Sequence, residues 1–206
     1  MSLSKRDDLG SIPSAPAVRD TFTMNKLIFF RELLKNWRQT SSVTPSSPFL
    51  IRKMLKRVDF GRARLIVELG PGTGPITREI LKRMRSDATL IVFELNETFC
   101  GILRKINDPR LSVRRVSAQN ISTILRGERA DYIISGLPLA VFDKKVVRQI
   151  FGEVKKHLKP GGAYAQFQYS LASLKTMRAN FPEVRTSFVP MNIPPAFVYY
   201  ASCRSR

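Results

Sequence analysis

A chain of 206 residues, 43% of them hydrophobic and 25% charged, suits one folded domain with or without an arm. Its two cysteines, Cys100 and Cys203, lie far apart and indicate neither a disulfide framework nor a zinc site. The net charge of +19 exceeds the roughly 2–8 that solubility requires, which favours an anionic partner such as nucleic acid or an acidic membrane surface.

The first 60 residues divide into two predicted units. Residues 1–20 are polar and without periodicity, so we expect a disordered arm that contains no secretory signal. Residues 21–60 are expected to hold an amphipathic helix over 22–39, a Ser/Thr/Pro loop over 40–48 and a short helix over 49–56.

The helix predicted over residues 22–39 has an apolar stripe and a basic face. The stripe includes Leu27, Phe30, Leu34 and Trp37. The cations are Lys26, Arg31, Lys35 and Arg38. Such a helix either packs its stripe on the domain or lies on an anionic bilayer, with Trp37 at the headgroup level and the cations at phosphates.

From residue 61 onward, short apolar strands alternate with helices, which predicts one α/β domain over residues 61–206 with a doubly wound, mainly parallel sheet. The expected strands are 65–68, 90–94, 111–116, 131–134 and 163–168, followed by an antiparallel pair at 187–189 and 198–201. The expected helices are 76–84, 99–106, 144–158 and 171–179.

A glycine-rich turn follows the first of these strands. Gly70, Gly72 and Gly74 permit a tight turn and the close approach of a ligand to the backbone. The Gly-x-Gly-x-Gly spacing differs from that of a dinucleotide site, and Glu68 at the strand end repels phosphate. The turn therefore favours a cationic ligand.

The second strand ends at Glu94, whose carboxylate can accept hydrogen bonds from both hydroxyls of a ribose. A glycine turn that favours a cation, combined with a ribose acceptor, predicts S-adenosylmethionine as cofactor. This nucleoside carries an ammonium and a sulfonium and has no phosphate.

VELGPGTG at residues 67–74 resembles the first motif of class I methyltransferases, and FELN at 93–96 resembles their ribose-binding strand end. A closer resemblance is to bacterial phospholipid N-methyltransferases, which methylate phosphatidylethanolamine. It rests on SSVTPSS, VELGPGTGPIT, ELNETFC, SGLPL and NIPPAFVY, which together span residues 40–200. The resemblance implies a Rossmann-like α/β fold whose mainly parallel, seven-stranded sheet ends in a C-terminal antiparallel hairpin.

The resemblance also implies a set of cofactor-binding residues. The set is Glu68, Gly70, Gly72, Gly74, Glu94, Leu95, Ala118, Gln119 and Ser135. After the third strand the family usually has Gly-Asp-Ala, whose aspartate binds the adenine amino group. This chain has Ser117-Ala118-Gln119-Asn120 instead, where an amide oxygen of Gln119 or Asn120 would replace that carboxylate.

The SGLPL segment at residues 135–139 is the expected acceptor loop. The catalytic residues are predicted to be Ser135, Gly136, Leu137, Pro138 and Tyr169. Backbone carbonyls of the loop would hold the amine, Pro138 would fix the loop, and an aromatic face at Tyr169 or Tyr164 would attract the methylated cation. The acceptor ammonium has a pKa of roughly 10 in water, and an apolar pocket lowers it. The amine can therefore lose its proton without a dedicated base. His157 is expected at a solvated helix end rather than in catalysis.

Related ribosomal RNA adenine dimethyltransferases have Asn-(Leu/Ile)-Pro-(Tyr/Phe) where this chain has SGLPL, which offers neither the amide nor the aromatic platform for a base. We therefore expect an enzyme at the inner face of the cell membrane that methylates phosphatidylethanolamine or a related aminophospholipid. Two alternatives stay open. An RNA adenine N6-methyltransferase agrees with the +19 charge, and a non-catalytic binding module agrees with the altered segment after the third strand.

Overall fold

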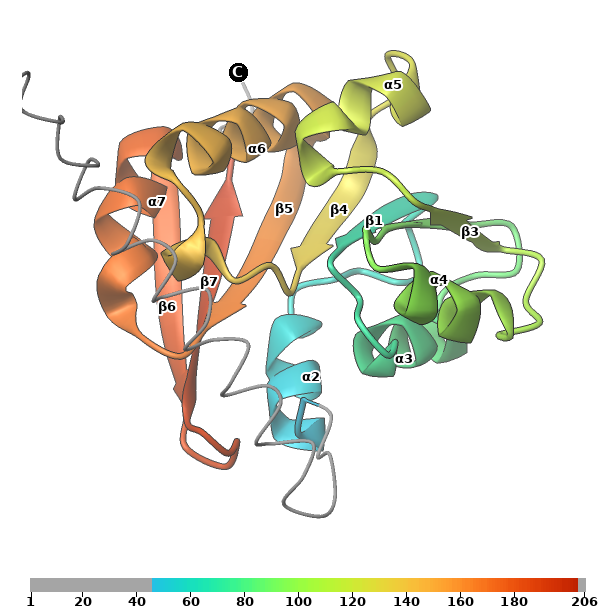
Figure 1. Cartoon of the computed structure of the whole chain (residues 1–206), viewed down its shortest axis with the longest axis horizontal. Coiled ribbons are helices and arrows are strands. Elements are labelled where there is room, and N and C mark those ends of the chain that lie inside the picture. Colours follow the sequence, from blue (N-terminus) through green and yellow to red (C-terminus); the bar gives the residue numbers. More distant parts are fainter. Residues whose placement is uncertain (1–45, 204–206) are drawn as a thin grey trace, which may run out of the picture.

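The computed structural model describes residues 46–203 (Figure 1). The predicted arm, the amphipathic helix at 22–39 with its cations and Trp37, and most of the loop that follows it lie outside the described residues. The domain boundaries at residues 20 and 60 stay predictions. Among the described helices, none has the length and apolar character that crossing a bilayer requires.

Seven strands form one sheet in the order β3-β2-β1-β4-β5-β7-β6. The strands are β1 (Leu65–Leu69), β2 (Thr89–Phe93), β3 (Leu111–Arg114), β4 (Ala130–Ser135), β5 (Leu158–Gln168), β6 (Glu183–Val189) and β7 (Ala196–Ser202). The α-helices are α2 (Pro48–Met54), α3 (Pro75–Arg83), α4 (Glu97–Arg104), α5 (Ile121–Leu125), α6 (Lys144–His157) and α7 (Leu174–Asn180). Short 3₁₀ turns occupy Ala118–Asn120, Leu139–Val141 and Leu171–Ser173.

Strands β1 to β5 pair in parallel, whereas β7 is antiparallel to both β5 and β6. This arrangement confirms the predicted doubly wound, mainly parallel sheet with an antiparallel C-terminal hairpin. The strand order reverses between β1 and β4. Ligands of such sheets bind at the carboxyl ends of the strands beside this reversal.

Helices cover both faces of the sheet (Figure 1). All five residues of β1 are buried, because alternate side chains enter different layers. Val67 and Leu69 pack in a cluster with α5, α6 and α7, and Ile66 packs in a second cluster with α2 and α3. The helix α2 belongs to this second layer, since Leu50 is fully buried there.

The predicted elements differ from the observed ones mainly at their ends. The helix expected from residue 99 begins at Glu97, because the Asn96 side chain caps it by accepting a hydrogen bond from the Phe99 amide at 3.1 Å. The strand expected from residue 163 begins directly after α6, at Leu158. The helix α5 was not predicted, since five residues are too few to show a helical period.

Two other elements were also predicted with different bounds. The first strand of the C-terminal pair is longer than the expected 187–189, because it begins at Glu183. The helix expected over 171–179 is a 3₁₀ turn followed by α7.

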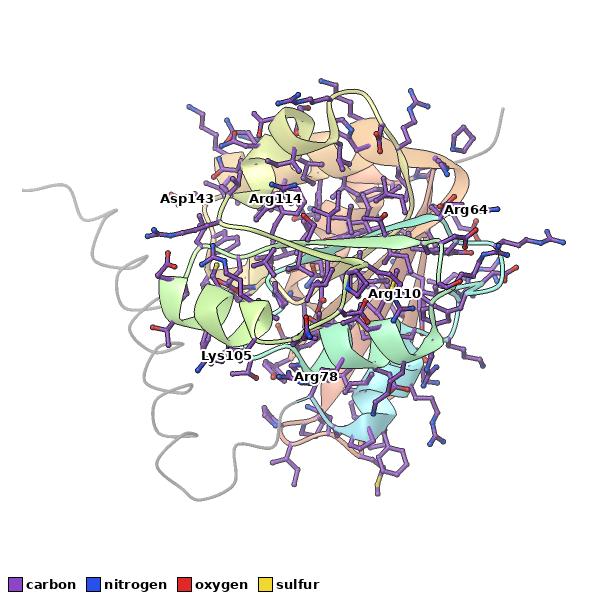
Figure 2. The ribbon with its side chains drawn as sticks, turned by 90° about the vertical axis from the view of Figure 1, so that its right-hand side faces the viewer. Arg64, Arg78, Lys105, Arg110, Arg114 and Asp143 are labelled. Carbon is purple, nitrogen blue, oxygen red and sulfur yellow. The ribbon has the colours of Figure 1, made fainter. Side chains whose placement is uncertain are left out.

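Some of the many basic side chains hold elements of the domain together. Figure 2 labels Arg78, which belongs to α3, and Arg110, which lies near the carboxyl end of that helix. Arg110 donates to the carbonyls of Leu81 and Met84 at 2.8 and 2.9 Å, which satisfies the carboxyl end of α3. Arg78 donates to the Thr73 carbonyl at 2.7 Å and so supports the turn before the helix.

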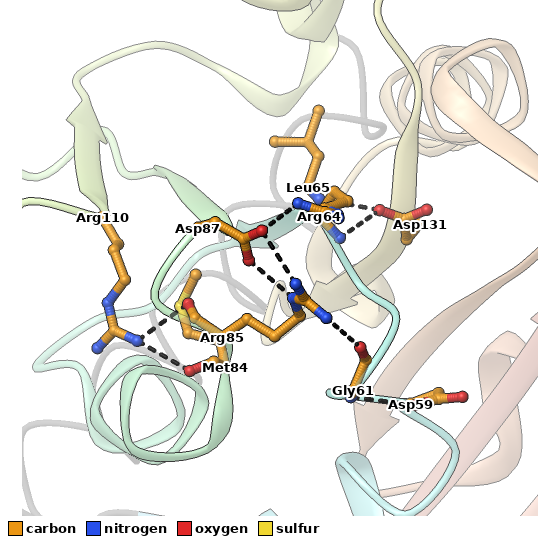
Figure 3. A network of polar contacts seen from close by, with 9 residues as sticks. All are labelled: Asp59, Gly61, Arg64, Leu65, Met84, Arg85, Asp87, Arg110 and Asp131. Atoms are coloured by element: carbon orange, nitrogen blue, oxygen red, sulfur yellow. Dashed lines mark hydrogen bonds and ion pairs between the residues drawn. The ribbon is translucent and has the colours of Figure 1, made fainter.

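A polar network joins the amino ends of β1 and β4 (Figure 3), and Lys159 of β5 also belongs to it. Asp131 accepts hydrogen bonds from the amides of Arg64 and Leu65 at 2.8 and 2.9 Å and from the Lys159 ammonium at 2.6 Å. Burial alone would raise the pKa of the Asp131 carboxyl, but these hydrogen bonds outweigh it and hold the pKa below its usual value. Asp87 pairs with Arg64 beside it.

We predict that Asp131→Ala lowers the free energy of unfolding at pH 7 by about 2–3 kcal/mol, because two backbone donors and an ammonium lose their acceptor. A carboxyl whose pKa is lower in the folded than in the unfolded state stabilises the fold at pH values above its unfolded pKa. This contribution is lost as the pH falls. The difference between variant and wild type in urea denaturation should therefore shrink below a pH of about 4. Asp59→Ala, at an exposed ion pair with Arg62, should cost less than about 1 kcal/mol. Equal losses of unfolding free energy in both variants would contradict the structural role assigned to Asp131.

Candidate functional site

Three loops meet at the carboxyl edge of the central strands. Leu69 at the end of β1 pairs in register with Phe93 of β2 and with Ser135 of β4, so the three strands end level with one another. The glycine turn follows β1, Glu94 follows β2 and the SGLPL loop follows β4. The predicted residues of these loops therefore come from separate parts of the chain to one edge of the sheet.

The glycine turn leaves open space at its middle glycine, Gly72. Gly70, Gly72 and Gly74 have φ angles of 67°, 58° and 85°, which residues with a side chain adopt only with strain. A Cβ built on Gly72 would meet no atom within 4 Å. Gly72 thus presents bare backbone to open space, whereas a Cβ at Gly70 or Gly74 would lie 2.8 Å from the side chain of Leu137 or Leu103.

The Glu94 carboxylate lies at this turn. One oxygen accepts a hydrogen bond from the Gly72 amide at 3.1 Å, and the other accepts from the Asn96 amide at 2.9 Å. Leu95 beside it is 62% exposed. The structure therefore brings together Glu94 and the glycine turn, the two features from which the cofactor was predicted.

Glu68 lies beneath the turn and faces α3. Its side chain is buried and accepts a hydrogen bond from the Thr77 hydroxyl at 2.6 Å. Burial raises the pKa of this carboxyl to about 8, although the Thr77 hydrogen bond acts in the opposite direction, and the charge of Glu94 adds to the increase. Glu68 is therefore mainly neutral at pH 7, which the sequence did not indicate.

The SGLPL loop touches the glycine turn through its backbone. The Gly136 amide donates to the Leu69 carbonyl at 2.8 Å. A Cβ at Gly136 would lie 2.8 Å from the Gly70 carbonyl oxygen, so no side chain fits at this position without a shift of the backbone. Within residues 46–203, the Gly136 carbonyl itself receives no hydrogen bond.

The Leu137 carbonyl, by contrast, already accepts three hydrogen bonds. One comes from the Leu139 amide at 2.9 Å, across an inverse γ-turn centred on Pro138, with φ −79° and ψ 73°. The others come from the side-chain amides of Gln166 and Gln168 at 2.9 and 2.8 Å. Because a carbonyl has two lone pairs, this oxygen has no capacity left for a ligand.

Gln166 and Gln168 are not among the residues predicted from the sequence. Both are buried and lie on the same face of β5. Two amides at alternate positions of an otherwise apolar strand are the signal that could have identified them, because buried polar groups need partners.

The two tyrosines considered as aromatic contacts for the methylated ammonium differ in position. Tyr164 is fully buried in the core, where its ring stacks on Phe181 with centroids 5.6 Å apart. Tyr169 follows β5, is partly exposed and meets Phe167 edge-on at 5.7 Å. Burial raises the pKa of Tyr169 to about 12. Phe167 also lies next to Gly136, so the Phe167 ring lies between Tyr169 and the acceptor loop.

The segment at residues 117–120 follows β3, the strand that pairs with β2. Ala118 is buried, and the Gln119 amide donates to the side chain of Gln149 in α6 at 2.5 Å. The Gln119 oxygen accepts a hydrogen bond from Ser117 at 3.3 Å. The structure thus gives Gln119 a role in joining this turn to α6, and its contact with a cofactor stays a prediction.

The solvated position expected for His157 is wrong. Its ring is 1% exposed and makes hydrogen-bond contacts of 2.8 Å with the Ser122 hydroxyl and the Glu128 carbonyl. The reason is that α6 passes directly into β5, so its last residue lies under the 122–128 segment. This is the amino end of β5, opposite the edge that carries the glycine turn.

Comparisons with known proteins agree with this architecture. Residues 66–162 match the family model described as a methyltransferase domain. An ornithine lipid N-methyltransferase from Singulisphaera acidiphila is 36% identical, and the match covers 86% of this chain and 94% of that protein. A ribosomal RNA small subunit methyltransferase A from Mycoplasma capricolum is 31% identical over 94 residues, 43% of this chain and 34% of that protein.

Among solved structures, a precorrin-6y C5,15-methyltransferase from Geobacter metallireducens superposes with a TM-score of 0.63. The superposition covers 80% of this chain and 93% of that one. At 14% identity this likeness supports the fold alone.

We predict that Glu68→Gln removes a pH-dependent loss of stability. A folded pKa of about 8 lies above the unfolded value of 4.5, so this carboxyl contributes stability that is complete below pH 4.5 and is lost as the pH rises toward 8. In urea denaturation, the free energy of unfolding of the variant should therefore rise relative to that of wild type between pH 5 and pH 8. Glu97→Gln, an exposed control, should show no such gain. A constant difference between Glu68→Gln and wild type at the two pH values would contradict the buried, neutral carboxyl.

Proposed function

Because the chain belongs to the bacterial lipid N-methyltransferases, within the class I S-adenosylmethionine-dependent methyltransferases, we propose that it methylates the amine of an aminolipid at the surface of the cell membrane. The observation that carries this proposal is the nearly full-length match to an ornithine lipid N-methyltransferase. Ornithine lipid is therefore the first candidate acceptor. Phosphatidylethanolamine is the second, on the motifs that resemble the phospholipid enzymes.

The residues at the glycine turn fit S-adenosylmethionine, whose sulfonium supplies an electrophilic methyl group. We assign the nucleoside to the open space above Gly72, where Glu94 would accept hydrogen bonds from the ribose hydroxyls. Glu68 lies beneath the same turn in a neutral form. A cation bound nearby would favour its ionised form, so cofactor binding should release a proton at neutral pH.

The acceptor amine is assigned to the loop after β4. Methyl transfer needs an amine lone pair held in line with the sulfonium, so the loop contributes mainly position. The Gly136 carbonyl is the acceptor best placed for an amine N–H, since the neighbouring Leu137 carbonyl is already saturated. Apolar surroundings from Leu137 and Phe167 would lower the pKa of the amine and so favour its reactive form.

The test is transfer of label from S-adenosylmethionine to vesicles that contain ornithine lipid, phosphatidylethanolamine or only phosphatidylcholine, with total RNA as a parallel substrate. Label should enter one or both aminolipids and not phosphatidylcholine, which has no amine hydrogen to replace. Label in RNA, or none in any lipid, would overturn the proposal.

Glu94→Ala should weaken S-adenosylmethionine binding by more than tenfold in calorimetry, because each hydrogen bond to a charged group contributes about 1.5–3 kcal/mol. Glu97→Ala is the matched control: this exposed carboxylate lies three residues further on and pairs with Arg104 and Arg115. Its affinity should equal that of wild type. Unchanged affinity in Glu94→Ala would remove Glu94 from the cofactor site.

Gln168→Met should lower turnover about two- to tenfold, since the acceptor loop loses one buried hydrogen bond worth about 0.5–1.5 kcal/mol. Cofactor affinity should stay at the wild-type value, because Gln168 donates to the Leu137 and Phe167 carbonyls and not to the glycine turn. Single-turnover rates and calorimetry separate the two effects. A loss of cofactor affinity without a change in turnover would show that Gln168 does not act through the loop.

A further inference from the structure

An open groove of about 580 Å³ lies between α2 and the turn that joins β6 to β7. Its apolar lining includes Phe49, Phe188 and Met191, which are 49%, 52% and 62% exposed. Ile193, on the same turn, is 78% exposed. Four of the six large apolar side chains that residues 46–203 expose therefore gather here, and such gatherings mark interaction surfaces.

The same groove carries uncompensated positive charge. Arg52, Lys53 and Lys56 line it, and no acidic residue does. Within residues 46–203 none of the three forms an ion pair, whereas Arg64 and Arg110, labelled in Figure 2, pair with aspartates. An apolar surface combined with unpaired cations fits a partner that is itself anionic and apolar.

The groove reaches the edge of the sheet that carries the candidate site. Gln168 of β5 pairs with Phe197 of β7, which pairs with Phe188 of β6, so the β6–β7 turn projects from the same edge as the loop after β4. The start of α2 is attached there, since the Ser47 amide donates to the Asn192 side chain at 2.9 Å. Figure 1 shows α2 beginning beside this turn.

We propose that this groove rests on an anionic phospholipid bilayer, with Phe49 and Met191 at the acyl boundary and Arg52, Lys53 and Lys56 at lipid phosphates. Apolar contact and attraction to anionic lipid together give interfacial binding. A bilayer satisfies both features, whereas RNA would leave the apolar residues in water. The basic segment 26–38 and a second copy of this chain, with its charge of +19, would each add like charge. The inference rests on the proposed function in one respect: a lipid amine at this surface lies near the Gly136 loop.

The experiment is flotation of the full chain with phosphatidylcholine vesicles that either contain or lack phosphatidylglycerol. Phe49→Ser/Met191→Ser tests the apolar part and Arg52→Gln/Lys56→Gln tests the charge. Lys145→Gln/Arg148→Gln removes two exposed cations from α6, on the other face of the sheet, as the matched control. We expect each groove variant to bind anionic vesicles about tenfold more weakly than wild type, and the control to bind like wild type. Thermal melting checks that the exposed substitutions leave the domain folded.

Wild-type flotation by both groove variants overturns the proposal. So does a loss of self-association or of RNA binding in these variants while vesicle binding persists. Methylation of aminolipid in neutral detergent micelles separates the bilayer contact of the groove from the proposed methyltransferase function. Groove variants that retain micellar activity and lose activity on anionic vesicles support the bilayer contact. A wild-type protein that floats with anionic vesicles but methylates no lipid refutes the proposed function and leaves the groove assignment intact.

Discussion

The missing side chain at residue 136 is the constraint on which the candidate site depends. The Gly136 backbone lies so near the Gly70 carbonyl that a Cβ would stand 2.8 Å from its oxygen. This contact, with the hydrogen bond from Gly136 to Leu69, joins the loop after β4 to the turn after β1. Because the strand order reverses between these two strands, the joined loops border the place where a doubly wound sheet binds its ligands.

Around the acceptor loop the site is built from burial and neutral hydrogen bonds, whereas the Glu94 carboxylate and the Arg78 guanidinium lie at the glycine turn. Glu68 is buried with a raised pKa, and the acceptor loop is held by the amides of Gln166 and Gln168. Such surroundings suit an amine that must lose its proton before it accepts a methyl group. Apart from Arg78 at the glycine turn, positive charge is found in structural pairs such as Arg110 with Asp108 and in the groove beside α2.

Most of the fold follows from short-range pattern in the sequence. Strands such as β1 and β4 are apolar runs bounded by turns, and their alternation with helices predicts the parallel sheet. The errors lie where local pattern is weak. The helix α5 is too short to be periodic, and the burial of His157 depends on the segment that covers the end of α6.

The sequence by itself determined the glycine turn and Glu94, because a Gly-x-Gly-x-Gly spacing and an acidic strand end are local features with a direct chemical meaning. Only the tertiary structure decided that Gln168 holds the Leu137 carbonyl, 31 residues away in the chain, and that Ser47 meets Asn192, 145 residues away. These contacts depend on the register of β5, β6 and β7. Register brings distant residues to one edge of the sheet, and no spacing within the sequence encodes that meeting.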